Sequence, residues 1–185
     1  MFGRKMSLWK LKRLAKSGDG EACFEVGACY LNGIGTDKDV DRAVEFLKMG
    51  AEHGNAGAAM TLGDMLECGY INEKGYRIAD YDAAFILFKI ASDGELAAGM
   101  HRMGRMYRDG RGVPQNSEKA LSMITDAAER GWSPAQMDLY YMYKDGQGAE
   151  ADMEKAMDYL RMAAENDNEE ALLKLEYLAP DKIQE

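Results

Sequence analysis

Two glycines separated by one residue, Gly33 and Gly35 in the segment YLNGIG, are the first feature of the sequence that could support chemistry. A glycine-rich turn either holds a phosphate with its backbone N–H groups or ends a helix. Phosphate-binding motifs need a third glycine after a strand, or a Lys followed by Ser or Thr, and the sequence has neither here. We interpret the pair as a helix stop and predict no cofactor-binding residue.

A second candidate, the acidic run DKDVD, fails as a calcium site. Asp37, Asp39 and Asp41 match the first three ligand positions of an EF-hand loop. The turn glycine would then fall on Arg42 and the bidentate acid on Lys48, so calcium is excluded.

The remaining reactive side chains also lack a pattern. Cys23, Cys29 and Cys68, with two histidines, fit no zinc spacing, and we expect three buried, reduced thiols. Serine, histidine and acidic residues occur, but no spacing indicates a nucleophile beside its base. His53, at the end of a helix, is interpreted as a partner of the helix dipole. The prediction is a protein that is not an enzyme, with no catalytic residue, no metal ligand and no cofactor.

Composition and charge narrow the class further. The 185 residues are 46% hydrophobic and 30% charged, the balance of a folded protein, with no run long enough to cross a bilayer and no secretory signal pattern. We therefore expect a cytoplasmic protein. Residues 1–16 hold six of the 23 cations and no acid, so 17 cations face 32 acids beyond them, a charge of −15. Such an acidic body repels phosphate backbones and argues against nucleic-acid binding.

The basic N-terminal segment has two interpretations. It could touch an anionic membrane, with Leu8 and Trp9 as anchors. We favour a first helix whose leucines cover the end of the core.

An internal repeat organises the chain. YLNGIG returns as YRDGRG at 107–112 and as YKDGQG at 143–148, and a degenerate copy, LECGYI, lies at 66–71. Apolar residues four apart before each turn and after it predict two helices per unit, and no segment shows convincing strand alternation. The positions that keep the repeat frame are Gly27, Tyr30, Gly33, Gly35, Ala43, Ala51, Gly54, Gly63, Gly69, Ala83, Ala91, Gly94, Gly104, Tyr107, Gly110, Gly112, Ala120, Ala128, Gly131, Tyr143, Gly146, Gly148, Ala156 and Ala164.

Glycines within the helices predict close packing. A mid-helix glycine costs about 1 kcal/mol relative to alanine, and Gly27, Gly63 and Gly104 repeat that cost, so we expect the paired helix to approach closely at each. Tyr140 stands at this position in the fourth unit, which predicts a looser or shifted hairpin there. The second unit carries four extra residues between Gly69 and Ala83, expected to form a surface loop.

The repeated glycines, alanines and tyrosines resemble the pattern of the Sel-1-like repeat family, relatives of the tetratricopeptide α-solenoids. The resemblance covers residues 18 to about 175 and implies an all-α fold, a right-handed α/α superhelix of about four helix-hairpin repeats. Family members mostly act as adaptors or scaffolds that bind proteins. Some secreted relatives carry a disulfide in each repeat and are linked to β-lactam binding or hydrolysis, but this chain lacks those cysteine pairs. The predicted single domain, 1–185, comprises a leading basic helix (5–17), repeats at 21–54, 57–94, 98–131 and 134–166, and a polar-faced capping helix at 169–179.

The partner-binding surface is predicted from the helix period. The first helix of each pair lines the inner, concave surface of such a superhelix. Three positions per repeat, set relative to Gly27, form a stripe facing away from the paired helix. This inner stripe consists of Phe24, Ala28, Leu31, Met60, Asp64, Glu67, His101, Arg105, Arg108, Met137, Tyr141 and Lys144.

We predict an adaptor or scaffold that binds a protein partner or an acidic peptide segment in this groove. Arg105, Arg108 and Lys144 would meet carboxylates, and Met137 and Tyr141 would supply apolar anchors. Alternatives are a bacterial immunity or antitoxin-like inhibitor of a basic toxin and, less favoured, a β-lactamase-like hydrolase. The sequence predicts no membrane span and no nucleic-acid partner, and it is compatible with a homo-oligomer.

Overall fold

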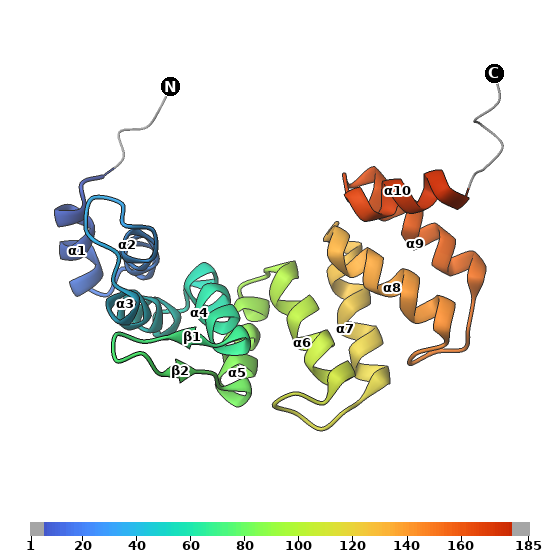
Figure 1. Ribbon diagram of the computed structural model, residues 1–185, viewed down its shortest axis with the longest axis horizontal. Helices are drawn as coiled ribbons and strands as arrows, with labels where there is room; N and C mark the ends of the chain where they lie inside the picture. The colour runs from blue at the N-terminus through green and yellow to red at the C-terminus, as the bar shows by residue number, and fades with distance from the viewer. Residues whose placement is uncertain (1–5, 179–185) are drawn as a thin grey trace, which may run out of the picture. The chain divides into compact units, whose positions relative to one another are not determined.

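The computed structural model describes residues 6–178, and within that range the chain is an all-α array of helix hairpins with one short β-hairpin (Figure 1). The chain divides into two compact units, one up to Gly99 and one from Met100 onward, which we describe separately. The elements are α1 (Leu8–Lys16), α2 (Gly20–Asn32), α3 (Val40–Glu52), α4 (Ala56–Cys68), β1 (Tyr70–Ile71), β2 (Arg77–Ile78), α5 (Tyr81–Asp93), α6 (Ala97–Asp109), α7 (Ser117–Glu129), α8 (Ser133–Asp145), α9 (Met153–Glu165) and α10 (Glu169–Leu178).

Side-chain caps begin most of these helices. At each capped start, an Asp or Asn oxygen accepts a hydrogen bond from the backbone N–H three residues later, which satisfies one of the free donors of the first turn. The distances are 2.7–3.0 Å. The capping residues are Asp19, Asp39, Asn55, Asp80, Asn116 and Asp152.

The paired glycines end the first helix of a repeat, as the sequence predicts. Gly33 and Gly146 follow α2 and α8 in the left-handed conformation, with φ of 70° and 71°. The second glycine of each pair, Gly35 or Gly148, also has positive φ, a conformation in which a side chain is strained. YLNGIG is therefore a helix stop and turn.

The mid-helix glycines mark close helix contacts, which confirms the prediction made for them. A Cβ placed on Gly63 would lie 2.6 Å from the Phe88 ring of α5, and one on Gly104 would lie 2.5 Å from Ile124 of α7. In the fourth repeat, Tyr140 is buried and packs in one cluster with residues of α9.

The first helix covers the end of the core in the first unit. Leu11 and Ala15 of α1 are buried beside Val26 and Tyr30 of α2, and Leu8 and further apolar residues pack around them. This packing confirms the interpretation of the basic segment as an end helix. Residues 5 and 179, the outer bounds of the two predicted terminal helices, lie outside the described range.

The four-residue insertion forms a β-hairpin that was not predicted from the sequence. β1 and β2 pair antiparallel, with Tyr70 opposite Ile78. The Asn72 side chain accepts hydrogen bonds from the N–H groups two and four residues later, at 3.1 and 2.9 Å, and Gly75 has a φ of 79°. Strands of two residues are too short to show alternation, so only the turn residues of NEKG signal the hairpin.

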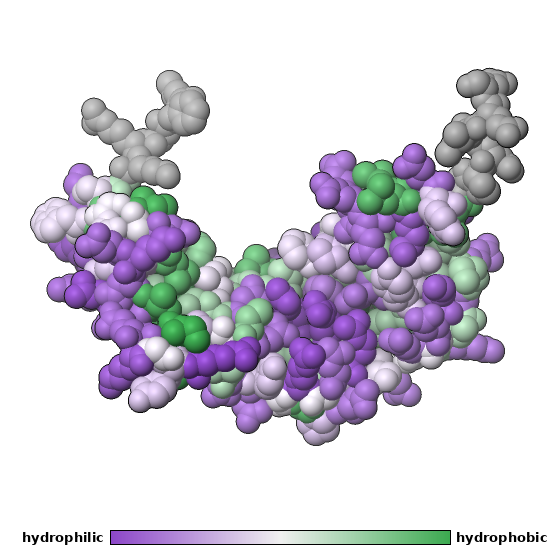
Figure 2. Space-filling view, in the orientation of Figure 1, coloured by the Kyte–Doolittle hydropathy of each residue, from purple (hydrophilic) through white to green (hydrophobic). Residues whose placement is uncertain are grey.

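Two further expectations need correction. The thiols are free, but only Cys23 is buried, since Cys29 is half-buried and Cys68 is exposed. The exposed surface of α10 is mixed rather than polar: beside three exposed glutamates, its exposed apolar residues are Leu172, Leu173, Tyr177 and Leu178. Figure 2 shows the corresponding apolar surface over α10, at the upper right of the view.

Candidate functional site

In the first unit, the inner stripe is half-buried and lies against the core. Phe24, Leu31 and Met60 are half-buried and pack against the cluster that contains Leu47 and Leu62. The acidic members, Asp64 and Glu67, are also half-buried. The helix period places these five residues on one side of α2 and α4. Most of their surface is buried against neighbouring residues, so only part of it is accessible to a partner.

In the second unit, the stripe divides between buried and accessible residues. His101 and Met137 are buried, with 6% and 4% of their surfaces exposed. Arg105, Arg108 and Tyr141 are half-buried, like the stripe residues of the first unit, and Lys144 is exposed. These last four are therefore the stripe members of the second unit that a partner could contact.

A polar cluster joins α6 and α8 at this stripe. The His101 ring donates from Nε2 to Asp138 Oδ2 at 2.9 Å, and its Nδ1 accepts from the indole N–H of Trp132 at 3.3 Å. Arg108 Nη1 lies 3.2 Å from the same Asp138 oxygen. Because both ring nitrogens of His101 are engaged and the ring is buried, His101 has no free lone pair with which to act as a general base.

The electrostatics of the cluster depend on Asp138. Burial raises the pKa of its carboxyl, but the hydrogen bond from His101 and the charges of Arg108 and Arg105 outweigh burial and hold the pKa below its usual value. Arg108 also forms an ion pair with Asp109 at 3.0 Å. The cationic stripe predicted from the sequence is therefore partly neutralised by carboxylates that were not assigned to the site from the sequence.

A cavity of about 640 Å³ opens beside this cluster. Arg108, Asp138 and Tyr141 line it from α6 and α8, and Ser117 and the turn that contains Gly146 and Gly148 complete it. The Tyr141 hydroxyl donates to Glu170 of α10 at 2.5 Å, and the Lys174 ammonium lies 5.1 Å from the Tyr141 ring centroid. The cavity thus offers an arginine, an aromatic ring and several carboxylates to a ligand.

Asp138 and Trp132 were not predicted as site residues, although the repeat period contains a signal for one of them. Asp138 is 37 residues after His101, close to one repeat length. Residues one repeat apart lie on neighbouring first helices, so a histidine and an acid at this separation are candidates for a contact. Trp132, directly after the turn glycine Gly131, has no such signal.

Over residues 6–178, no group of three or more His, Cys, Asp or Glu side chains is arranged to hold a metal ion. In the same range, no helix is both long enough and apolar enough to cross a membrane.

Repeated helix hairpins with glycine turns and small residues at the helix contacts define an α-solenoid repeat protein. Comparison with family models finds the Sel1 repeat four times, at residues 20–55, 62–95, 97–132 and 133–168. The chain therefore belongs to the Sel1 repeat family, as the resemblance in the sequence predicted.

Solved structures agree with this fold. A protective antigen of uropathogenic Escherichia coli strains that displays an SLR fold matches with a TM-score of 0.83 and 29% identity over 94% of this chain. A Sel1 repeat protein from Oxalobacter formigenes matches with a TM-score of 0.80 and 26% identity, also over 94% of this chain. The chain covers 36% and 49% of these two proteins, respectively, so it spans half of their length or less.

A more distant match is an immunity protein from Pseudomonas aeruginosa, with a TM-score of 0.56 and 18% identity. The match covers 89% of this chain and 59% of that protein. At this identity the likeness shows the fold alone.

Proposed function

We propose that this protein is a non-catalytic protein-binding module, an adaptor or scaffold, that binds its partner along the inner stripe of the first helices. Its membership of the Sel1 repeat family supports this proposal, because the family is typically a non-catalytic protein-interaction fold. In the second unit, the contact residues are the accessible members of the stripe: Arg105, Arg108, Tyr141 and Lys144.

The observation that carries the proposal is the state of Arg105. Its Nε is shielded from solvent and has no hydrogen-bond partner within residues 6–178, while the side chain as a whole is half-buried. Arg108, in contrast, is engaged by Asp109 and Asp138. The guanidinium of Arg105 adds positive charge beside Asp138 and is partly exposed, so a carboxylate of a protein partner or an acidic peptide suits it.

The test begins with a partner isolated by affinity purification from the host, which is then purified and titrated calorimetrically against the chain. We expect Arg105→Glu and Tyr141→Ala each to weaken binding by about tenfold or more, because each removes an accessible anchor of the stripe in the second unit. The matched control is Arg130→Glu, which makes the same charge change at the exposed end of α7 in the same unit.

Circular dichroism of each variant checks that the helices remain folded. Equal affinity for Arg105→Glu and the unmodified chain would remove the stripe from the interface. Turnover of a β-lactam or ester substrate by the purified chain would contradict the non-catalytic assignment and favour the hydrolase alternative.

An immunity-like inhibitor is the second candidate, and the charge of the chain favours it. The chain carries a net charge of −9, and the part beyond residue 16 carries −15. Such a surface would associate quickly with a basic toxin at low salt. Co-expression with the product of a neighbouring reading frame tests this candidate: rescue of growth is expected, and no rescue contradicts it.

A further inference from the structure

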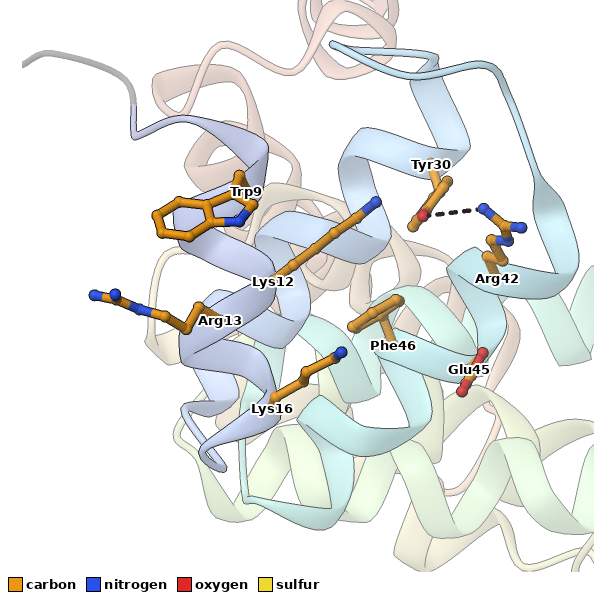
Figure 3. A pocket seen from close by; sticks show the side chains of 8 residues that line it. All are labelled: Trp9, Lys12, Arg13, Lys16, Tyr30, Arg42, Glu45 and Phe46. Atoms are coloured by element: carbon orange, nitrogen blue, oxygen red, sulfur yellow. Dashed lines mark hydrogen bonds between the residues drawn. The ribbon is translucent and has the colours of Figure 1, made fainter.

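A second cavity, of about 430 Å³, lies in the first unit between α1, α2 and α3 (Figure 3). Four of its lining side chains are cationic, and one, Glu45, is anionic. Its volume is within the range of ordinary ligand sites. The cations are Lys12, Arg13, Lys16 and Arg42.

These cations are unusual in an acidic protein because most of them lack a carboxylate partner among the described residues. Arg42 pairs with Asp39 at 3.0 Å. Within residues 6–178, the salt bridges include none for Lys12, Arg13 or Lys16. In the second unit, by contrast, carboxylates accompany the cation Arg108. The cavity of the first unit therefore keeps a local positive charge that a ligand can neutralise.

Tyr30, a buried residue of the core cluster, holds two of these cations beside the cavity. Its hydroxyl oxygen accepts from Arg42 Nη1 at 3.4 Å, and hydrogen bonds from Lys12 and Arg42 together lower the pKa of the hydroxyl. The Lys12 ammonium also lies 4.8 Å from the Tyr30 ring centroid. Tyr30 therefore positions Lys12 and Arg42 at the cavity.

The spacing of the lysines indicates how far apart the carboxylates of a ligand should be. Lys12 and Lys16 are four residues apart on α1, about 6 Å along the helix axis, and both extend toward Tyr30 and Phe46 (Figure 3). Carboxylates at alternate positions of an extended chain are about 7 Å apart, and those four apart on a helix are about 6 Å apart. Either arrangement places one carboxylate at each lysine.

An aromatic side chain flanks the lysines. Trp9 is 66% exposed, and the Arg13 guanidinium lies 5.2 Å from its ring centroid. Trp9 can therefore cover the backbone or an apolar side chain of a bound segment.

We propose that this cavity, with Lys12, Lys16 and Trp9 as its contacts, binds an acidic segment of a protein partner through paired carboxylates. The inference rests on the proposed protein-binding function and adds to it a separate site with a defined ligand chemistry. An anionic membrane fits the site less well. Leu11 and Ala15 of α1 are used in the core, which leaves only Trp9 and Met6 as large exposed apolar residues of the described part of this segment to enter a bilayer.

The test titrates the whole chain with an acetylated hexaglutamate peptide and follows the fluorescence of Trp9 in a Trp132→Phe background, where Trp9 is the remaining tryptophan. We expect saturable one-to-one binding that weakens with added salt. Lys12→Gln/Lys16→Gln should weaken it by about tenfold or more, because two charge-assisted contacts are lost. Lys74→Gln/Lys89→Gln, at two exposed sites of the same unit, should change it by less than about threefold.

Further ligands and variants establish whether the binding depends on carboxylates and on this cavity. Hexaglutamine should not bind, and vesicles with phosphatidylglycerol should not shift the Trp9 spectrum. Vesicle binding without peptide binding would overturn the proposal in favour of a membrane surface. If Lys12→Gln/Lys16→Gln and Lys74→Gln/Lys89→Gln bind the peptide equally well, binding is a non-specific charge effect and the proposal is wrong.

Loss of this acidic-segment site can be distinguished from loss of the proposed protein-binding function. A partner that binds the unmodified chain and is weakened by Arg105→Glu, but not by Lys12→Gln/Lys16→Gln, leaves the module intact and removes only this site. Circular dichroism confirms that the variants keep their helices.

Discussion

Gly63 shows how one residue sets the distance between two helices. It lies within α4, and a Cβ there would be 2.6 Å from the ring of Phe88, which is fully buried. The ring has no space to move, so the gain of about 1 kcal/mol in helix propensity from alanine is outweighed by overpacking. We expect Gly63→Ala to lower the free energy of unfolding by about 1–3 kcal/mol, measured by urea denaturation.

Gly57, near the start of the same helix, provides the matched control. A Cβ there would be 3.3 Å from Phe24, a half-buried side chain that can shift. We expect Gly57→Ala to change the free energy of unfolding by less than about 1 kcal/mol. Phe88→Leu should partly restore stability in the Gly63→Ala background, and strict additivity of the two changes would contradict the contact.

At the scale of the helix, the residue before α7, Asn116, caps the helix and contributes to its stability. The sequence allows either Asn116 or Ser117 as the cap, and the structure selects Asn116, whose side chain accepts from the N–H of Lys119 at 2.8 Å. We expect Asn116→Ala to reduce the free energy of unfolding by about 1 kcal/mol, because one donor of the first turn loses its partner. Thermal and urea unfolding measure the change.

Ser117→Ala is the comparison, since Ser117 is the first residue of α7 and its side chain is not the cap. Its effect should stay within about 0.5 kcal/mol. A larger loss for Ser117→Ala than for Asn116→Ala would contradict the assignment.

The elements were predictable to different degrees for identifiable reasons. Helices with an Asp or Asn cap, an apolar stripe and a glycine after the helix end carry local signals, so α2 and α7 follow from the sequence. The β-hairpin at 70–78 does not, because its strands are two residues long and its turn depends on one asparagine side chain. The exposed leucines of α10 were also missed, since a polar face was expected for the capping helix at 169–179.

At the scale of the whole molecule, the helical repeat array was predictable and the charge balance of the candidate sites was not. The repeat period identifies which residues share the first-helix stripe, but it does not show which carboxylate of a neighbouring helix reaches them. Arg108 was predicted to be available, yet Asp109 and Asp138 engage it. Lys12 and Lys16 were assigned to an end helix, yet they also line a cavity and have no carboxylate partner within residues 6–178.

A repeat array is held together by contacts between neighbouring helices, so stability should vary along the chain. In α9, Ala156, Leu160 and Ala163 are buried, whereas the buried residue of α10 is Ala171. We expect the amides of α10 to exchange with deuterium about tenfold faster or more than those of α9, because α10 opens at a lower free-energy cost. Exchange followed by mass spectrometry measures the two helices in one sample.

The Tyr141 hydroxyl ties α10 to α8 through Glu170, at 2.5 Å. Tyr141→Phe should therefore speed exchange in α10 severalfold, by the loss of one charge-assisted hydrogen bond, without changing α9. Tyr159→Phe removes a hydroxyl from α9, where the Tyr159 ring stacks on Tyr143 of α8, and it should leave α10 unchanged. Protection of α10 equal to that of α9 would contradict the lower stability expected of α10.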